Sequence, residues 1–352
     1  MQTSHVPGRF ARSVLVAAGV VVILAGFKLS AQLIVPFLLA AFIALLCSAP
    51  LFWLNRKGVP NAVSVLIVVL GVLAVGTVLG LTAGSSVNAF TQALPEYSDN
   101  LNKQFDGILT GLEAYGVEVD DYRESISSVA DPSAALTMAV SGLKKTGGML
   151  ANSFMILLTV IFILLEAVSM PEKLRRVVPD PEKTFDGVRT FVQSVKRYLV
   201  IKTVVSAITG LLAGVSTAII GVDFPVLWGV LAFAFNFVPT VGSIIAAVPP
   251  VLLGVVQFGP GAVLSVGGAY AVINVVMGNI VEPRLTGEGL GLSSLVVFLS
   301  LVFWGWILGP VGMLLSVPLT MIVKIACESS ENAKPIGILL GPPIPADKPK
   351  AG

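Results

Sequence analysis

The sequence predicts an all-α polytopic membrane protein, and three observations support this prediction. Of the 352 residues, 55% are hydrophobic and only 12% are charged, whereas soluble domains carry about 25% charged residues. The apolar residues gather in about eight segments, and a membrane-spanning helix needs roughly 20 apolar residues. Some of the 35 glycines and 22 prolines interrupt two of these segments near the middle, which is typical of the broken helices of transporters.

The composition also excludes several classes of protein. The net charge of +2 provides no basic surface for nucleic acid. One histidine and two cysteines cannot build the usual metal clusters or a disulfide framework. The sequence has no Walker-type phosphate loop, no HExxH motif and no nucleophile elbow. We therefore expect neither enzyme activity nor a cofactor, while coupling to protons or sodium stays open.

The eight apolar segments follow one another along the chain. Only a few residues separate the first from the second, so these two predict an uncleaved helical hairpin rather than a signal peptide. The sixth and the eighth each have roughly 34 residues, which is more than one crossing requires. The segments cover residues 10–27, 33–54, 62–87, 149–170, 198–222, 224–258, 262–281 and 292–325.

The charge distribution predicts which parts face the cytoplasm. Lys and Arg gather in the N-terminal stub, at Arg56 and Lys57, and in residues 171–197, and the positive-inside rule makes these regions cytoplasmic. Both termini are then expected in the cytoplasm. The predicted division is N-terminal membrane helices (1–88), an acid-rich extracytoplasmic helical cap (89–148), a fourth membrane helix (149–170), a cytoplasmic basic loop (171–197), a transport core (198–326) and a cytoplasmic tail (327–352).

The acid-rich segment has a regular apolar pattern. Between Leu94 and Leu112, apolar residues that include Tyr97 recur at steps of three and four, which predicts one face of a helix. We interpret this segment as a helical cap that packs on the membrane domain. The alternative is an oligomer contact or a gate element.

Charged residues inside apolar segments are informative, because each costs about 2.5 to 3.5 kcal/mol on insertion scales. Glu166 lies near the inner end of the fourth segment, where it either pairs at the membrane edge or serves as an ion-coupling carboxylate. Lys202 lies one turn into the fifth segment. It either reaches the interface or pairs with a carboxylate or a substrate oxygen. Asp223, at the end of that segment, is expected in a turn.

An amide in the sixth segment is a candidate contact for a substrate. Asn236 lies between two phenylalanines, and a buried amide needs a hydrogen-bond partner. Pro239 and Gly242 follow it and are expected to break the helix. A broken helix exposes backbone groups at membrane depth, which is tolerated where protein or a cavity surrounds them. Asn236 therefore either packs between helices or contacts a substrate.

A second polar group closes the seventh segment. Asn279 and Glu282 are three residues apart, which places them on one face of an α-helix. Pro283 is expected to end the helix at Glu282, and Arg284 is close enough to neutralise that carboxylate. The group is either a structural helix terminus or a mobile gate, and its remaining members are Asn274 before it and the hinge glycines Gly289 and Gly291 after it.

The two long segments resemble each other. Pro239 and Gly242 precede Pro249 in the first, and Pro310 and Gly312 precede Pro318 in the second. The pattern suggests an inverted repeat of a span followed by a re-entrant hairpin. In that arrangement the loop after Glu282 is cytoplasmic. If each long segment instead crosses once, this loop faces outward.

Several blocks of this sequence resemble the autoinducer-2 exporter family of bacterial membrane proteins. They read FNFVPTVGS at 235–243, GNIVEPR at 278–284, GLGLS at 289–293, FWGW at 303–306 and GPVGMLLSVP at 309–318, with VPF at 35–37. The resemblance implies an inner-membrane secondary transporter that exports a small polar quorum-sensing signal, autoinducer-2. It also implies a homo-oligomer, with a pentamer expected. Some relatives in the family are thought to exchange sodium or protons.

The hypothesis is a carrier that works by alternating access, with its substrate where the two broken segments meet. Asn236, Asn279 and Glu282 are the expected polar contacts, and Lys202 and Glu166 are further candidates. The lipid bilayer and a small polar solute are the expected partners. A cation/proton antiporter is the first alternative, with Glu166 or Glu282 as the titrating carboxylate, and a passive pore or scaffold is the second.

Overall fold

The computed structural model describes residues 9–114, 153–177, 181–239, 241–286, 291–328, 331 and 333–342. These residues form helices joined by short turns, and no strand occurs among them. Six of the helices are long and apolar enough to cross a membrane. The predicted all-α polytopic membrane fold is therefore confirmed.

The N-terminal helices pack on one another through small and branched apolar side chains. α1 (Arg9–Leu29) leads through a turn at Ser30 into α2 (Ala31–Arg56), and α3 (Asn61–Ala114) follows. Ala40, Ala44, Cys47 and Leu51 recur at steps of four, three and four on α2, so they share one face. This buried face packs against α3 and α6 (Ser153–Val177).

α3 continues well beyond the apolar stretch that predicts it. Its apolar part ends near Ala93, but the helix runs without interruption to Ala114. The helix predicted between Leu94 and Leu112 is therefore confirmed as an extension of the third span. Tyr97, in this extension, is buried against the core that contains Trp228. The rest of the predicted cap lies outside the described residues.

The basic segment between the fourth and fifth spans is also largely helical. α6 continues to Val177, and α7 (Pro181–Ile220) begins soon after it. Further along, α7 crosses α8 (Pro225–Phe235) at very close range. A β-carbon added to Gly210 would lie 2.6 Å from the carbonyl oxygen of Gly229, so only glycine permits this crossing, as in small-residue contacts between membrane helices.

Both long segments are broken in the structure. The first consists of α8 and α9 (Val241–Phe258), which pack on each other. The second consists of α12 (Ser294–Leu314) and α13 (Ser316–Glu328), which also pack on each other. Inside α12, Gly309 has φ 68° and ψ −151°, values that only glycine adopts easily. The helix therefore bends there.

The run between the two broken segments contains two π-helical stretches, η2 and η3. It consists of η2 (Val263–Gly267), α10 (Gly268–Asn274), η3 (Val275–Val281) and α11 (Glu282–Thr286). The prediction that Pro283 ends the helix at Glu282 is wrong, because Glu282 has φ −59° and ψ −48° and α11 continues through the proline. The wider π-helical turn just before it provides the adjustment that a proline inside a helix needs.

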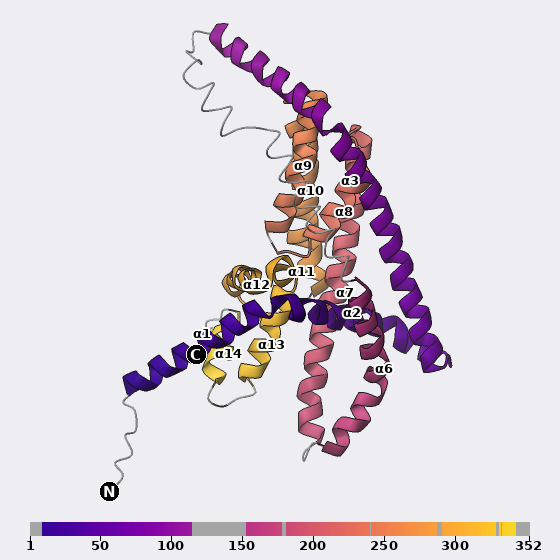
Figure 1. Cartoon of the computed structure of the whole chain (residues 1–352), viewed down its shortest axis with the longest axis vertical. Coiled ribbons are helices and arrows are strands. Elements are labelled where there is room, and N and C mark those ends of the chain that lie inside the picture. Colours follow the sequence, from indigo (N-terminus) through magenta and orange to yellow (C-terminus); the bar gives the residue numbers. More distant parts are fainter. Residues whose placement is uncertain are drawn as a thin grey trace, which may run out of the picture.

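Figure 1 shows how these parts are arranged. α7, α9 and α10 lie near the long axis, α3 runs beside them to the top, and α1 and α2 cross the lower half. α1 contacts α12, where the Lys28 ammonium lies 4.1 Å from the ring centre of Trp306. Short helix α14 (Lys334–Leu339) packs on α13. The α2–α3 turn and the adjoining ends of α6 and α7 lie in the lower half, opposite the end of α3.

Candidate functional site

One face of α7 carries a stripe of buried polar side chains. Lys202, Ser206 and Thr209 are spaced four and three residues apart, so they lie on the same side of the helix. Their exposed fractions are 5%, 0% and 3%. Since an α-helix rises about 1.5 Å per residue, the stripe is roughly 10 Å long.

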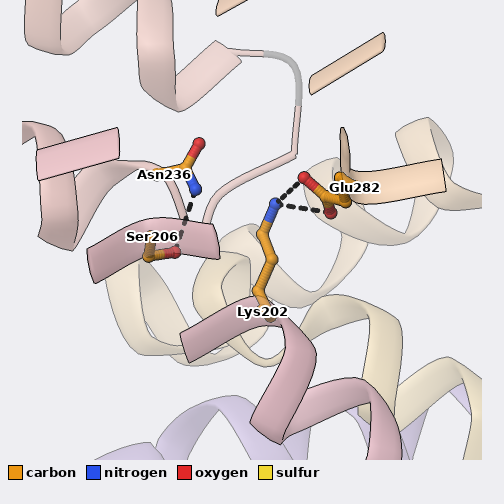
Figure 2. Close-up of polar contacts among 4 residues, drawn as sticks. All are labelled: Lys202, Ser206, Asn236 and Glu282. Atoms are coloured by element: carbon orange, nitrogen blue, oxygen red, sulfur yellow. Dashed lines mark hydrogen bonds and ion pairs between the residues drawn. The ribbon is translucent and has the colours of Figure 1, made fainter. Parts of the chain in front are cut away.

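Lys202 forms a buried ion pair with Glu282 (Figure 2). Its ammonium lies 2.8 and 2.9 Å from the two carboxylate oxygens, and the side chains are 6% and 25% exposed. Of the two alternatives for Lys202, the structure therefore selects the carboxylate partner. Arg284 is exposed, and the carboxylate predicted to be neutralised by it is held instead by a lysine 80 residues away in the sequence.

Asn236 ties the end of α8 to the same stripe. Its amide Nδ2 donates to Ser206 Oγ at 2.9 Å, and Figure 2 shows this pair beside the Lys202–Glu282 pair. The hydrogen-bond partner that the sequence requires for Asn236 is thus present. Asn236 is the first residue after α8, so the hydrogen bond connects the break of the first long segment to α7.

Ser206 is a member of this site that the sequence interpretation missed. The available signal was its position four residues after Lys202, because this spacing places both side chains on one face of the helix that contains them.

The first break has a close approach of backbone to backbone. α8 ends at Phe235 and α9 begins at Val241, so the helix is interrupted where Pro239 and Gly242 predict it. A β-carbon added to Gly242 would lie 1.9 Å from the carbonyl oxygen of Phe235. Any larger residue than glycine at position 242 would clash with this carbonyl oxygen. The first turn of α9 therefore packs directly against the end of α8.

The second break has the same kind of contact between a glycine and a backbone carbonyl, but its backbone conformation differs. A β-carbon added to Gly312 would lie 2.0 Å from the carbonyl oxygen of Trp304. The residue that leaves the helical conformation is Gly309, directly before Pro310, and the Gly–Pro pair was the signal for it. Pro318, predicted as a further break, lies in the first turn of α13, where proline is tolerated.

The remaining candidate residues take no part in the Lys202–Glu282 and Asn236–Ser206 pairs. Asn279 is exposed on η3, whereas Glu282 is half-buried, and a face shared by the two side chains stays a prediction. Glu166 lies on α6, where its carboxylate is 2.6 Å from the Lys173 ammonium. Gly291 has φ 64° just before α12, whereas Gly289 lies outside the described residues.

Metal binding has no support in the described part of the chain, where His, Cys, Asp and Glu form no group of three or more that could hold an ion. The polar atoms of the site are amide, hydroxyl, ammonium and carboxylate groups, and the two charges of the Lys202–Glu282 pair cancel. Such a site is suited to holding a neutral polar molecule.

Comparison with known proteins gives one consistent family. The profile described as "AI-2E family transporter" matches residues 18–332. The AI-2 transport protein TqsA of Escherichia coli K12 is 40% identical over 320 residues, covering 91% of this chain and 92% of the relative. A transport protein of Haemophilus influenzae is 39% identical (94% and 96% covered), and YhhT of Escherichia coli K12 is 36% identical (94% of each). The names of these last two specify no solute.

Proposed function

This chain belongs to the AI-2E transporter family, and from that membership and the geometry of its core we propose that it is a secondary transporter that exports a small polar quorum-sensing signal, autoinducer-2. The substrate is suggested by the name of one relative. The observation that carries the proposal is the buried polar stripe of α7, whose single charge is paired with Glu282 and which lies where the first long segment is broken.

The chemistry of the stripe supports a neutral solute. Lys202 and Glu282 cancel each other's charge, and between them in the sequence the only other charged residue is Asp223. Asp223 is engaged elsewhere, because it accepts hydrogen bonds from Tyr97 and Gln257. A bound solute would therefore meet amides and hydroxyls, which suit hydroxyl and carbonyl groups.

The two broken segments provide a mechanism for alternating access. In the proposed cycle, the solute replaces the Asn236–Ser206 hydrogen bond with its own, so that α8 and α9 can shift relative to α7. The Lys202–Glu282 pair holds α11 against α7 on the other side of the site. Opening one contact while the other stays closed would expose the solute to one side of the membrane at a time.

The proposed topology has two re-entrant hairpins, α8–α9 and α12–α13, with both termini in the cytoplasm of a bacterium and the protein in its inner membrane. The 11 residues of α8 are too few to cross a bilayer, which supports a hairpin. Glu288→Cys, in a chain whose two own cysteines are replaced by alanine, tests this topology through labelling with an impermeant reagent in intact cells and in inverted vesicles. Labelling only from the outside would rule out the hairpin arrangement.

We also propose that the protein is a homo-oligomer, with a pentamer as the expected number. The support is the family resemblance alone. Native mass spectrometry of the detergent-solubilised protein tests the number of copies, and a monomer at all protein concentrations would contradict it.

The transport proposal is tested with purified full-length protein in proteoliposomes. Uptake of labelled autoinducer-2 is expected to saturate, and Lys202→Met, Glu282→Gln and Asn236→Ala are each expected to lower kcat/KM about tenfold or more. Glu166→Gln is the matched control, because it neutralises a membrane carboxylate that also pairs with a lysine but lies on α6. Equal uptake by all four variants and the wild type would place the site elsewhere.

A second candidate function is exchange of sodium or another cation for protons. The observation that favours it is the Lys202–Glu282 pair itself, because a titratable pair in a transport core can carry a proton. Sodium-dependent proton flux in protein-containing vesicles, abolished by Glu282→Gln and retained in Glu166→Gln, would favour exchange. Linear, non-saturating flux of the solute would instead indicate a passive pore.

A further inference from the structure

A small cavity lies between α7, α8, α9 and α10, next to the stripe. Its polar lining residues are Thr209, Ser243, Tyr270 and Asn274, and the remaining walls are apolar side chains. The cavity has a volume of about 10 Å³, which is the space needed for one water-sized group. It begins one turn of α7 beyond Ser206, the residue that holds Asn236.

Two hydroxyl groups that line this cavity have no hydrogen-bond partner among the described residues. They are Thr209 Oγ1 and Tyr270 OH, and both residues are 3% exposed. Buried hydroxyls in proteins nearly always have a partner. The two groups come from different helices, α7 and α10, so a single small group between them could bond to both.

Thr209 differs from two other threonines of α7. Thr203 donates to the carbonyl oxygen of Leu199 at 2.8 Å, and Thr217 donates to that of Ala213 at 2.8 Å. This bond to the preceding turn is the usual way in which a threonine hydroxyl is satisfied inside a helix. Thr209 does not make it, so its hydroxyl is free to bond to a group in the cavity.

The lining determines the chemistry of that group. Threonine and tyrosine hydroxyls can each donate and accept a hydrogen bond, and the Asn274 amide does both as well. The lining residues carry no charge, so nothing there compensates a bound cation or anion. The group that fits is neutral, as small as water, and both a donor and an acceptor, which describes a hydroxyl.

We propose that this cavity is a subsite for one hydroxyl group of the transported solute, which is therefore a small neutral molecule with at least one hydroxyl group. The part of this inference that concerns transport rests on the function proposed above. Ser206 lies one turn along α7, and Asn236 at the end of α8 is bonded to it, so a second oxygen of the same solute can reach this pair while the first occupies the cavity. A water molecule is the other group that could occupy the cavity, and the experiment below distinguishes it from a hydroxyl group of the solute.

The experiment measures ligand binding to the full-length protein in lipid nanodiscs, from the shift of the thermal unfolding midpoint with autoinducer-2 and, separately, with erythritol. Thr209→Val and Tyr270→Phe each remove one hydroxyl and little volume, and each is expected to raise Kd about tenfold. Thr209→Ser keeps the hydroxyl and is expected to keep Kd within about twofold. Thr217→Val is the matched control, since that threonine is fully buried and its hydroxyl bonds to its own helix.

The outcomes separate this inference from the proposed function. If autoinducer-2 is neither bound nor transported, but erythritol binds and loses affinity in Thr209→Val, the substrate is wrong and the subsite stands. If Thr209→Val and Tyr270→Phe bind both compounds as tightly as Thr217→Val does, the subsite is refuted. If those two variants change only the unfolding midpoint without ligand, the cavity holds water alone and the inference is likewise refuted. Absence of binding by both compounds to the wild type also overturns it.

Discussion

The two broken segments share one contact and differ in what surrounds it. In both, a glycine after the break lies against a backbone carbonyl before it: Gly242 against Phe235, and Gly312 against Trp304. The first break then places Asn236 on the polar stripe of α7. The second is packed in a mainly apolar core with α2 and the N-terminal part of α7. The same backbone contact thus adjoins a polar stripe in the first segment and a mainly apolar core in the second.

The surroundings also differ in how each segment is tied to its neighbours. The start of α8 is fixed by Asp223, which accepts a hydrogen bond from Tyr97 of α3 at 2.6 Å, while its own carbonyl accepts one from Trp228 at 2.6 Å. The corresponding tie in the second segment is internal, because Trp304 Nε1 donates to Thr320 Oγ1 between α12 and α13 at 3.0 Å. The first segment is therefore linked to α3 by a side-chain hydrogen bond, whereas this hydrogen bond of the second segment joins its own two helices.

The largest effect is expected where the two segments are alike. Gly242→Ala and Gly312→Ala each place a methyl group about 2 Å from a carbonyl oxygen, so each should destabilise the protein by about 3 kcal/mol. Thermal unfolding in detergent measures this change. Gly76→Ala is the control, because no atom lies within 4 Å of its added β-carbon. If Gly312→Ala behaved like Gly76→Ala, the two breaks would not share this contact.

A smaller effect should distinguish the segments in transport. Asn236→Ala removes the amide that bonds to Ser206, so kcat/KM for the solute should fall about tenfold, which equals about 1.4 kcal/mol. Thr320→Val removes the hydroxyl that accepts from Trp304 and should leave KM unchanged. Uptake into proteoliposomes measures both. A rise in KM for Thr320→Val would show that the second segment also contacts the solute.

The internal tie of the second segment should instead appear in its stability. Thr320→Val should lower the free energy of unfolding by about 1 kcal/mol, because the Trp304 N–H loses its acceptor. Chemical unfolding in mild detergent measures this difference, with Thr217→Val as a comparison that leaves no other side chain without its partner. If Thr320→Val were as stable as the wild type, the Trp304–Thr320 hydrogen bond would not stabilise the second segment.

An equally small effect concerns the hydrogen bond between α3 and the turn before the first segment. Burial, together with the Asp223 carboxylate as acceptor, raises the pKa of Tyr97 above its ordinary value. The protonated Tyr97 hydroxyl, which donates to Asp223, therefore stabilises the fold fully below the pKa of an unfolded tyrosine, about 10. This stabilisation is lost as pH rises through the higher pKa of Tyr97 in the folded protein. Tyr97→Phe should cost about 1 kcal/mol at pH 7 and should weaken the loss of stability above a pH of about 10.

Unfolding midpoints measured from neutral pH to about one unit above the ordinary tyrosine pKa test this last expectation. Thr217→Val is the control, because it removes no titratable group and keeps Tyr97 and its bond to Asp223. An alkaline loss of stability that is equally steep in Tyr97→Phe and in the wild type would assign that loss to other groups.

Much of the fold was predictable because hydrophobic length and glycine–proline position are local properties. The spans, the break after Asn236 and the need of that amide for a partner all follow from neighbouring residues. The continuation of the helix through Pro283 was not predictable in this way, because the π-helical turn before it is a property of the packed helix.

Composition and local pattern were enough to establish a membrane protein with two broken segments and a nearly uncharged region between Lys202 and Glu282. They suffice because a bilayer admits few solutions for an apolar chain. Only the packed molecule shows three further features. Two are the contacts of Lys202 with Glu282 and of Ser206 with Asn236, and the third is the cavity that Thr209 and Tyr270 line. These contacts join residues of different helices, and their geometry depends on how α7, α8 and α10 pack.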